Sequence, residues 1–357
     1  MKPAVLAALG IVALAAVGGA VFIVTKQNAA TQEVQLGQRV FPELAARGDD
    51  VQTIIIARKE GTFRVVRDGD RWVVPDKSKY PASLDVVRRL LVGLSELRTM
   101  EAKTTQAALY PELGVENVDT PEAKSIQVTL QDVGGRNVLA VLVGKSRYGR
   151  GGNAGDGVYV RKVGENQAWL AQGRLSVERE IGAWLDKRIA DVPRERVQTV
   201  TLKADKQTLT VLRSKEDDKD FTLKDVPADR KAKPAYDINA VGGAFESLDL
   251  DDVRPAAEVN FSATSPTTEA VTFDGLRITA AFADKDGATW ARFSAKAEPP
   301  AQPVKTDGDS KLKSADDVKK EAEAINAKAG GWAYKLPAYK AETLRRKLED
   351  LLEQKAS

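Results

Sequence analysis

Few residues of this chain have the type and spacing that chemistry requires. Gly144-Lys145-Ser146 matches the end of a phosphate-binding loop, in which glycine amides and a lysine surround phosphate groups. Such a loop needs a glycine five residues before Gly144, where this chain has Leu139, and it must open a helix. The flanking residues predict a strand and a hairpin instead. We therefore predict no nucleotide site here.

A glycine-rich stretch at residues 149–157 is a second candidate. Its backbone amides can surround an anion, and Arg147 and Arg150 lie close to it in the sequence. Trp72 and Trp290 are candidates of another kind, because an aromatic cleft binds a sugar or an apolar ligand. The alternatives are structural: a hairpin tip for the glycines and core packing for the tryptophans. We keep these two arginines and two tryptophans as possible binding residues.

The composition excludes several kinds of catalysis. The chain has no histidine and no cysteine. Imidazole is the commonest general base and transition-metal ligand, and a thiolate is needed for cysteine nucleophiles and many zinc sites. Asp249, Asp251 and Asp252 lack the spacing of a calcium loop. We predict no catalytic residue, no cofactor and no metal, with a hydrolase that uses only carboxylates as the enzymatic alternative.

The charges of the chain nearly cancel. Lys and Arg total 54 against 51 Asp and Glu, a formal net charge of +3. Neutralising phosphates is the main source of affinity for nucleic acids, and it needs a clear excess of basic residues. We therefore predict that nucleic acid is not a partner.

The N-terminal segment predicts a membrane anchor. Residues 3–25 carry no ionisable side chain, and as a helix they span about 30 Å, the thickness of a hydrocarbon core. We expect a transmembrane anchor at residues 1–26 and a linker at residues 27–50. A cleaved signal peptide is the alternative, with Gly18-Gly19-Ala20 as its cleavage site, but Val21–Val24 continues the apolar run.

The short positive N-terminus resembles the start of a secretory signal, which translocates the residues that follow it. This favours a body on the extracytoplasmic side. A cytoplasmic body on a reversed anchor is the alternative, because Lys26, Arg39 and Arg47 follow the apolar segment.

The rest of the chain repeats a pattern. Val51–Ile56 reads Val-Gln-Thr-Ile-Ile-Ile and returns as Val-Gln-Thr-Val-Thr-Leu at Val197–Leu202, each time before a predicted hairpin. A helix with apolar residues three and four positions apart follows at residues 84–94 and again at 238–248. Further predicted strands come next. The order predicts an α+β fold of two tandem repeats, mainly antiparallel strands with packed helices, besides one N-terminal transmembrane helix.

We place the first repeat at residues 51–192 and the second at 193–357. Each is expected to end in a helix, around residues 177–185 and 344–351. The second has a polar insertion at residues 296–330. There a loop rich in proline and glycine leads to a helix that Ser314 and Asp317 are expected to cap. We interpret it as a mostly solvated surface insertion, with a partner-docking arm as the alternative.

Short motifs along the body carry a resemblance to a known family: Gly69-Asp-Arg-Trp72, Leu113-Gly114, Leu142-Val-Gly-Lys145, Val158-Tyr-Val-Arg161, Trp184-Leu-Asp-Lys-Arg188 and Trp332-Ala-Tyr334. The chain resembles a bacterial domain-of-unknown-function family, number 4340, whose members join an N-terminal membrane segment to a strand-rich repeated body. It departs from the family pattern where Leu113-Gly114-Val115 is separated from Pro121 by a polar stretch. The resemblance transfers no catalytic residue.

Family members are similar to proteins encoded beside an ATP-binding-cassette (ABC) transporter and a gliding-motility-type subunit. The resemblance therefore implies a non-enzymatic, membrane-tethered accessory subunit of an ABC-type transport system. We expect it in the bacterial inner membrane as a single-pass protein, with its body facing the periplasm. Its partners would be the membrane and transporter subunits, and its ligand is not identified. The alternative is a module that binds an envelope glycan or lipid in the cleft between the two repeats.

Overall fold

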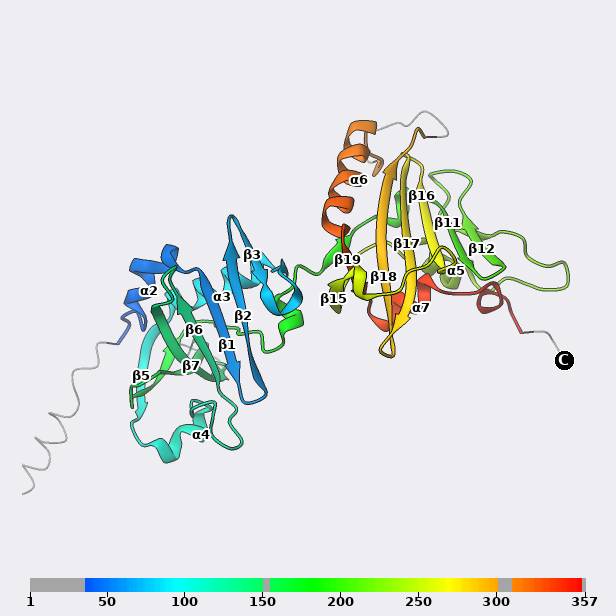
Figure 1. The fold of residues 1–357 in the computed structure, drawn as a ribbon. Coiled ribbons are helices and arrows are strands. Elements are labelled where there is room, and N and C mark those ends of the chain that lie inside the picture. The colour runs from blue at the N-terminus through cyan, green and yellow to red at the C-terminus, as the bar shows by residue number, and fades with distance from the viewer. Residues whose placement is uncertain (1–35, 150–154, 301–309, 355–357) are drawn as a thin grey trace, which may run out of the picture. The chain divides into compact units, whose positions relative to one another are not determined.

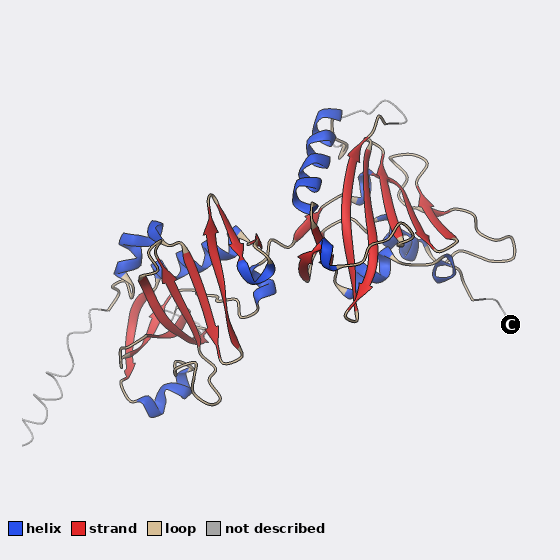
Figure 2. Cartoon of the chain, viewed as in Figure 1, coloured by secondary structure: helices blue, strands red, loops and turns tan. Residues whose placement is uncertain are grey.

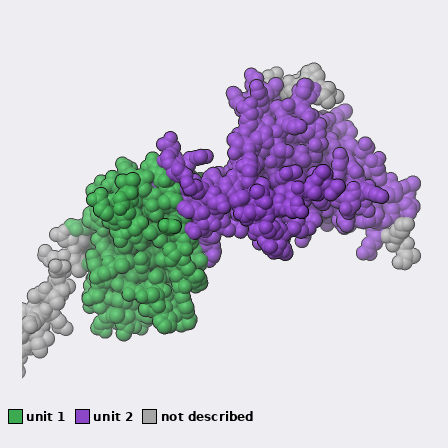
Figure 3. Space-filling model, viewed as in Figure 1, with its two compact units in different colours: residues 1–67, 85–179 green, residues 68–84, 180–357 purple. Residues whose placement is uncertain are grey.

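The computed structural model describes residues 36–149, 155–300 and 310–354 (Figure 1). The expected anchor at residues 1–26, residues 27–35 of the expected linker, and Arg150 lie outside these ranges. Within them, no helix combines the length and the apolar character that crossing a membrane requires. The chain divides into two compact units, residues 1–67 with 85–179 (unit 1) and residues 68–84 with 180–357 (unit 2) (Figure 3).

Antiparallel strands dominate both units, and the described ranges contain six α-helices (Figure 2). The coarse prediction of an α+β fold is therefore confirmed. Short 3-10 helices join the elements at Gly48–Asp50, Pro75–Lys77, Ala107–Leu109, Ile181–Trp184, Arg194–Arg196, Ala256–Glu258 and Leu348–Leu351.

Unit 1 holds seven consecutive strands of a nine-stranded sheet, in the order β2-β1-β6-β7-β8-β9-β5. Its strands bury alternate residues, as Ile54 and Ile56 of β1 show, and α3 covers the core with Val87, Leu90 and Leu94. The elements are α2 (Pro42–Arg47), β1 (Thr53–Arg58), β2 (Gly61–Asp68), α3 (Leu84–Glu96), β5 (Arg98–Thr104), α4 (Tyr110–Leu113), β6 (Ile126–Gln131), β7 (Asn137–Arg147), β8 (Gly157–Lys162) and β9 (Ala168–Gln172).

Unit 2 holds an eight-stranded sheet in the order β13-β12-β11-β16-β17-β18-β19-β15. Its elements are β3 (Arg71–Val74), β4 (Tyr80–Pro81), β10 (Arg188–Ala190), β11 (Val197–Ala204), β12 (Gln207–Leu212), β13 (Thr222–Leu223), α5 (Ala235–Gly242), β14 (Leu248–Asp249), β15 (Asp252–Pro255), β16 (Thr267–Thr272), β17 (Leu276–Lys285), β18 (Ala288–Ala297), α6 (Ala315–Ala329), β19 (Trp332–Lys335) and α7 (Ala338–Leu344).

The two sheets share one strand order. When β1 and β2 are matched with β11 and β12, β5 with β15, and β6 to β9 with β16 to β19, the neighbours along both sheets are the same. The two similar hexapeptides occupy matching places, because β1 pairs with β2 and β6 just as β11 pairs with β12 and β16. The repeated sequence thus marks the centre of each sheet.

The structure corrects three helix predictions. The helix expected around residues 344–351 does not form, since α7 ends at Leu344 and only a 3-10 helix follows at Leu348–Leu351. The helix expected around residues 177–185 is wrong, since only a 3-10 helix forms there, at Ile181–Trp184. The helix expected at residues 238–248 is shorter, ending as α5 at Gly242. The ring of Phe221 packs against that glycine so closely that an added Cβ would lie 2.3 Å from Phe221 Cε2.

The polar helix of the insertion, α6, is fastened to the sheet. Val318, Ala322, Ile325 and Ala329 form its buried face. Asn326 donates to the carbonyl of Ala295 in β18 at 2.7 Å and accepts from the amide of the same residue at 2.9 Å. The expected cap is confirmed, because the Ser314 hydroxyl accepts from the Asp317 amide at 3.2 Å.

A buried ion cluster holds the same helix. The Arg196 guanidinium lies 2.8 Å from Asp274 Oδ2 and 2.8 Å from Glu321 Oε2 of α6. Lys313, just before the helix, reaches Glu321 at 3.1 Å through its Nζ and donates its amide to Asp274 at 2.8 Å. The insertion therefore belongs to the folded body of unit 2, although its composition suggested a solvated helix.

Residues 68–84 contribute to the core of unit 2. The Tyr80 ring is fully buried and stands edge-on to Trp332, with ring centroids 5.0 Å apart. Its hydroxyl donates to the Asp186 carbonyl at 3.1 Å. Lys77 adds an ion pair of 2.6 Å with Asp252 of β15. These contacts join residues from the early part of the chain to strands that come more than a hundred residues later.

Candidate functional site

The two candidate tryptophans lie in unit 2. Trp290 is only 2% exposed, its Nε1 donates to the Lys285 carbonyl at 3.3 Å, and the Arg254 guanidinium covers its ring at 4.0 Å from the centroid. Trp72 is half-buried in β3, and its carbonyl accepts from the Ala82 amide at 2.8 Å. The structure thus places Trp290 in a packed cluster and leaves part of Trp72 accessible.

Arg147 lies in unit 1 at the end of β7, half-buried, with Nη2 3.5 Å from the sulfur of Met100. Arg147 and the two tryptophans thus belong to different units. The Gly144-Lys145-Ser146 tripeptide lies within β7, which confirms the prediction of a strand. Lys145 Nζ donates to the Glu112 carbonyl at 2.7 Å, and a Cβ on Gly144 would lie 2.3 Å from the Leu113 oxygen. This glycine therefore serves close packing.

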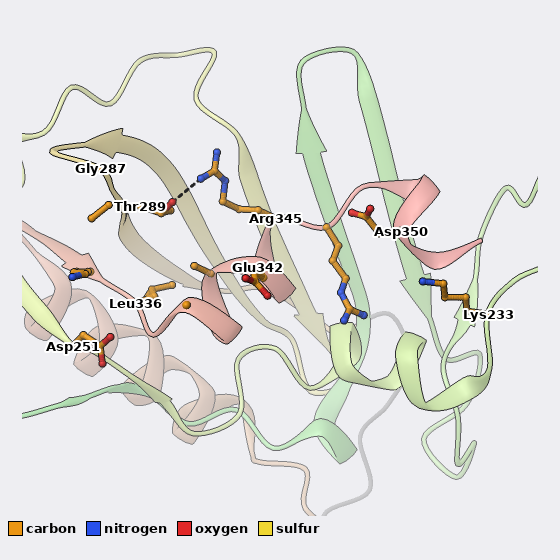
Figure 4. Close-up of a pocket in the computed structure, with 13 residues that line it drawn as sticks. Lys233, Asp251, Gly287, Thr289, Leu336, Glu342, Arg345 and Asp350 are labelled. Carbon is orange, nitrogen blue, oxygen red and sulfur yellow. Dashed lines mark hydrogen bonds between the residues drawn. The ribbon is translucent and has the colours of Figure 1, made fainter. Parts of the chain in front are cut away.

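A hollow of about 900 Å³ lies within unit 2 (Figure 4). The turn between β17 and β18 contributes Gly287, the residue after β19 is Leu336, and α7 forms a further wall. We call it the unit 2 hollow. Its charged lining consists of four basic and three acidic side chains, Lys233, Lys335, Arg345, Arg346, Asp251, Glu342 and Asp350.

One wall of the unit 2 hollow is fixed by Arg345. Its Nη1 donates to Asp284 Oδ1 at 2.8 Å and to the Thr289 hydroxyl at 2.7 Å, and Nη2 reaches Asp284 Oδ2 at 3.1 Å (Figure 4 shows the bond to Thr289). The hydrogen bond from Arg345 is the main reason that the pKa of Asp284 lies below its usual value, and the hydrogen bond from Thr289 contributes less. Arg345 is thus engaged in joining α7 to the β17–β18 turn.

Other lining residues are held by the backbone. Arg346 Nη1 donates to the Asp237 carbonyl at 3.0 Å, and Asp350 accepts from the Lys347 amide at 2.8 Å. The Lys233 amide donates to the Leu351 carbonyl at 2.8 Å, which positions that residue at the rim. Because positive and negative side chains are almost balanced, the hollow suits a polar ligand or a polypeptide segment better than a strongly charged one.

Asp249, Asp251 and Asp252 stand close together in the sequence. Residues 36–149, 155–300 and 310–354 contain no group of three or more acidic side chains that could hold a metal ion. Asp251 lines the unit 2 hollow, whereas Asp249 pairs with Arg188 at 2.6 Å and Asp252 with Lys77. The three aspartates that stand together in the sequence therefore serve different contacts.

The unit 2 hollow was not anticipated from the sequence. Its residues come from positions 233, 251, 287–289 and 335–350, and the topology of the sheet brings them together. Among the residues that line the hollow, Asp251 belongs to the group of aspartates that the sequence places close together. A run of charges at residues 342–350 was the remaining signal, and it also fits an ordinary solvated helix.

The fold and the hollow define an α+β protein of antiparallel sheets with a hollow of mixed charge in unit 2. The profile of a family described as "Domain of unknown function (DUF4340)" matches residues 72–269, which is more than half of the chain. The protein therefore belongs to the DUF4340 family. No curated protein matches the chain, and no solved structure matches it either.

Proposed function

We propose that this protein is a non-enzymatic, membrane-tethered accessory subunit of an ABC-type transport system, with its body on the extracytoplasmic side. The observation that carries the proposal is the uncharged apolar segment at residues 3–25, placed directly before a large folded body. The absence of histidine and cysteine supports a binding role over a catalytic one. The transporter partner rests on the family resemblance.

We also propose that the body arose by duplication of one α+β repeat. The common strand order of the two sheets and the matching hexapeptides support this origin. In an accessory subunit, two repeats of the same fold provide two similar scaffolds whose loops can differ. The unit 2 hollow is the surface that we assign to a transporter subunit, because its mixed charges suit a polar protein interface.

The proposal is tested by cross-linking in native membranes. The full chain with a C-terminal tag is cross-linked, purified and analysed for co-purified proteins. We expect subunits of an ABC transporter to be recovered. The control replaces residues 1–26 with a cleavable secretion signal, which should release the body and lose the partners. Recovery of the same proteins without the anchor would contradict the tether, and recovery of no transporter subunit would contradict the accessory role.

A second candidate function is binding of an envelope glycan, now placed in the unit 2 hollow. Its volume of about 900 Å³ and its polar lining favour a hydroxylated ligand. Glycan fragments are titrated against the full chain, with binding followed by tryptophan fluorescence. We expect Glu342→Gln to weaken binding about tenfold, equivalent to about 1.4 kcal/mol. Arg188→Ala, outside the hollow, serves as the control and should change nothing. A panel of glycans without any response would remove this candidate.

A further inference from the structure

Unit 1 contains a groove of about 610 Å³ whose lining differs from that of the unit 2 hollow. It lies between one face of α3, the end of β7 and residues 173–176 that follow β9. We call it the unit 1 groove and define it by six of its lining residues, Arg89, Val92, Arg147, Tyr148, Arg174 and Leu175.

The backbone shapes this groove. Arg89, Val92, Gly93 and Glu96 follow the spacing of one helix face, so they form a continuous wall. Gly93 lets the opposite wall approach, since a Cβ there would lie 3.1 Å from Leu175 Cδ1 and 3.2 Å from the Arg174 oxygen. The helix and the segment after β9 therefore meet at the floor of the groove, where a larger residue would push them apart.

Apolar side chains line part of the groove and remain open to solvent. Val92 is 44% exposed and Tyr148 is 78% exposed, although both are large hydrophobic residues. Leu175 is half-buried beside Gly93. Apolar side chains that gather in one groove indicate a ligand with an apolar part, whereas single exposed ones need no explanation.

The charges of the groove favour an anion. Three arginines face two acidic residues, Glu96 and Asp156. Asp156 pairs with Arg174, 2.8 Å from its Nε, and accepts from the Gly149 amide at 3.3 Å, so Arg89 and Arg147 remain to face Glu96. Arg147 has its Nη2 directed at the thioether of Met100, at 3.5 Å, which is a weak acceptor. Its other guanidinium donors suit the bidentate binding of a carboxylate.

We propose that the unit 1 groove binds a long-chain fatty acid. The Arg147 guanidinium binds the carboxylate, and Arg89 adds positive charge at the rim. The acyl chain lies along Val92, Leu175 and Tyr148. The volume falls within the range of about 300–1,000 Å³ that is usual for small-ligand sites. This inference goes beyond the accessory role and does not depend on any transporter.

The test measures binding of radiolabelled palmitate to the full chain in nanodiscs of zwitterionic lipid, with empty nanodiscs subtracted. We expect saturable binding that Arg147→Ala weakens at least tenfold and that Arg147→Lys weakens less. Val92→Asp should weaken it similarly, because it places a negative charge beside the acyl chain. The matched control is Arg88→Ala, which removes the neighbouring arginine of α3, 64% exposed and outside the groove. It should leave binding unchanged.

Two competitors identify the chemistry. Palmityl alcohol should compete at least tenfold more weakly than palmitate, and inorganic phosphate should not compete at all. Thermal unfolding of each variant must match that of the original chain, so that a loss of binding is not a loss of folding. Binding no greater than in empty nanodiscs, equal effects of Arg147→Ala and Arg88→Ala, or displacement by phosphate alone would each overturn the proposal. None of these results depends on the cross-linking that tests the accessory role.

Discussion

Units 1 and 2 have sheets of one strand order, and each has a hollow at the corresponding place. The unit 1 groove lies where the β7–β8 connection meets the segment after β9. The unit 2 hollow lies where the β17–β18 turn meets the segment after β19. After β9 the chain passes through Gly173 without forming an α-helix, whereas after β19 it forms α7. The two sheets have the same strand order, but unit 1 carries a partly apolar groove with arginines at its rim and unit 2 carries a polar hollow. The connecting segments, rather than the strands, account for this difference.

Buried arginines are satisfied in two ways: Arg161 of unit 1 and Arg213 of unit 2 donate to neutral acceptors, whereas Arg196 of unit 2 depends on carboxylates. In unit 1, Arg161 donates to the carbonyls of Val115 and Glu165, both at 3.0 Å, and to the side-chain oxygen of Asn117. In unit 2, Arg196 depends on the carboxylates of Asp274 and Glu321. Neutral acceptors do not titrate in acid, whereas a carboxylate gains a proton when the pH falls below its pKa. The Arg196 cluster of unit 2 is therefore more sensitive to acid than the surroundings of Arg161.

The largest expected effect comes from breaking that cluster. Asp274→Ala leaves Arg196 buried with only one of its two carboxylate partners. We expect a loss of about 3–5 kcal/mol in the unfolding free energy of unit 2. Urea unfolding of the full chain is followed by fluorescence in a Trp169→Phe background. Of the five tryptophans, the other four lie in unit 2, so the signal reports that unit.

Asp249→Ala is the matched control, because Asp249 pairs with Arg188 at 2.6 Å on the surface, with both side chains more than 40% exposed. It should cost less than about 1 kcal/mol. Equal losses for Asp274→Ala and Asp249→Ala would show that burial of the cluster contributes nothing.

Acid should weaken the Arg196 cluster of unit 2. Burial opposes ionisation of Asp274, but hydrogen bonds from Arg196, Thr272 and the Lys313 amide outweigh it and hold the pKa of Asp274 below its ordinary value of 3.8. The resulting stabilisation is complete above that value and is lost as the pH falls below it. We expect the urea midpoint of unit 2 to fall as the pH drops below about 4. Asp274→Asn should flatten this dependence, and an unchanged slope would refute the assignment.

A smaller effect is expected at the end of α5. Gly242→Ala forces a Cβ against the Phe221 ring, so we expect a loss of about 1–3 kcal/mol in the same urea assay. Gly243→Ala is the control, because its nearest neighbour would lie at an ordinary 3.6 Å. Equal costs at Gly242 and Gly243 would contradict the packing account.

The smallest effect concerns α6, which has no counterpart in the short β8–β9 connection of unit 1. Ser314→Ala removes the cap and should cost about 1 kcal/mol, measured as a shift of the urea midpoint of unit 2. Lys320→Ala removes an exposed partner of Asp317 at 3.7 Å and should change stability by less than about 0.5 kcal/mol. If Ser314→Ala lowers stability less than Lys320→Ala does, the cap contributes little and α6 is held by its buried contacts.

Local patterns in the sequence predicted the central elements of the fold. The hexapeptides before β2 and β12, the apolar spacing of α3 and the Ser314 cap all act over a few residues, and each was found in its place. β5 and β15 were not predicted. Arg98–Thr104 and Asp252–Pro255 lack clear alternation, because edge strands carry charged residues and form through pairing with β9 and β19.

The candidate sites were harder to predict than the fold. Arg147 was singled out because it stands beside a glycine-rich stretch, whereas Arg89 and Val92 fit an ordinary solvated helix face. Their shared groove exists because Gly93 and Gly173 bring the segment after β9 against α3. Such convergence depends on tertiary contacts, which short-range periodicity does not record.

The placement of residues 68–84 within unit 2 has a consequence for synthesis on the ribosome. Tyr80 is made long before Trp332 and Tyr334, the rings that enclose it. At about 5–20 residues per second, the wait is roughly 10–50 seconds. During that interval the nascent chain holds an aromatic side chain with no finished core to enter, so a chaperone that shields it would improve the yield of native protein.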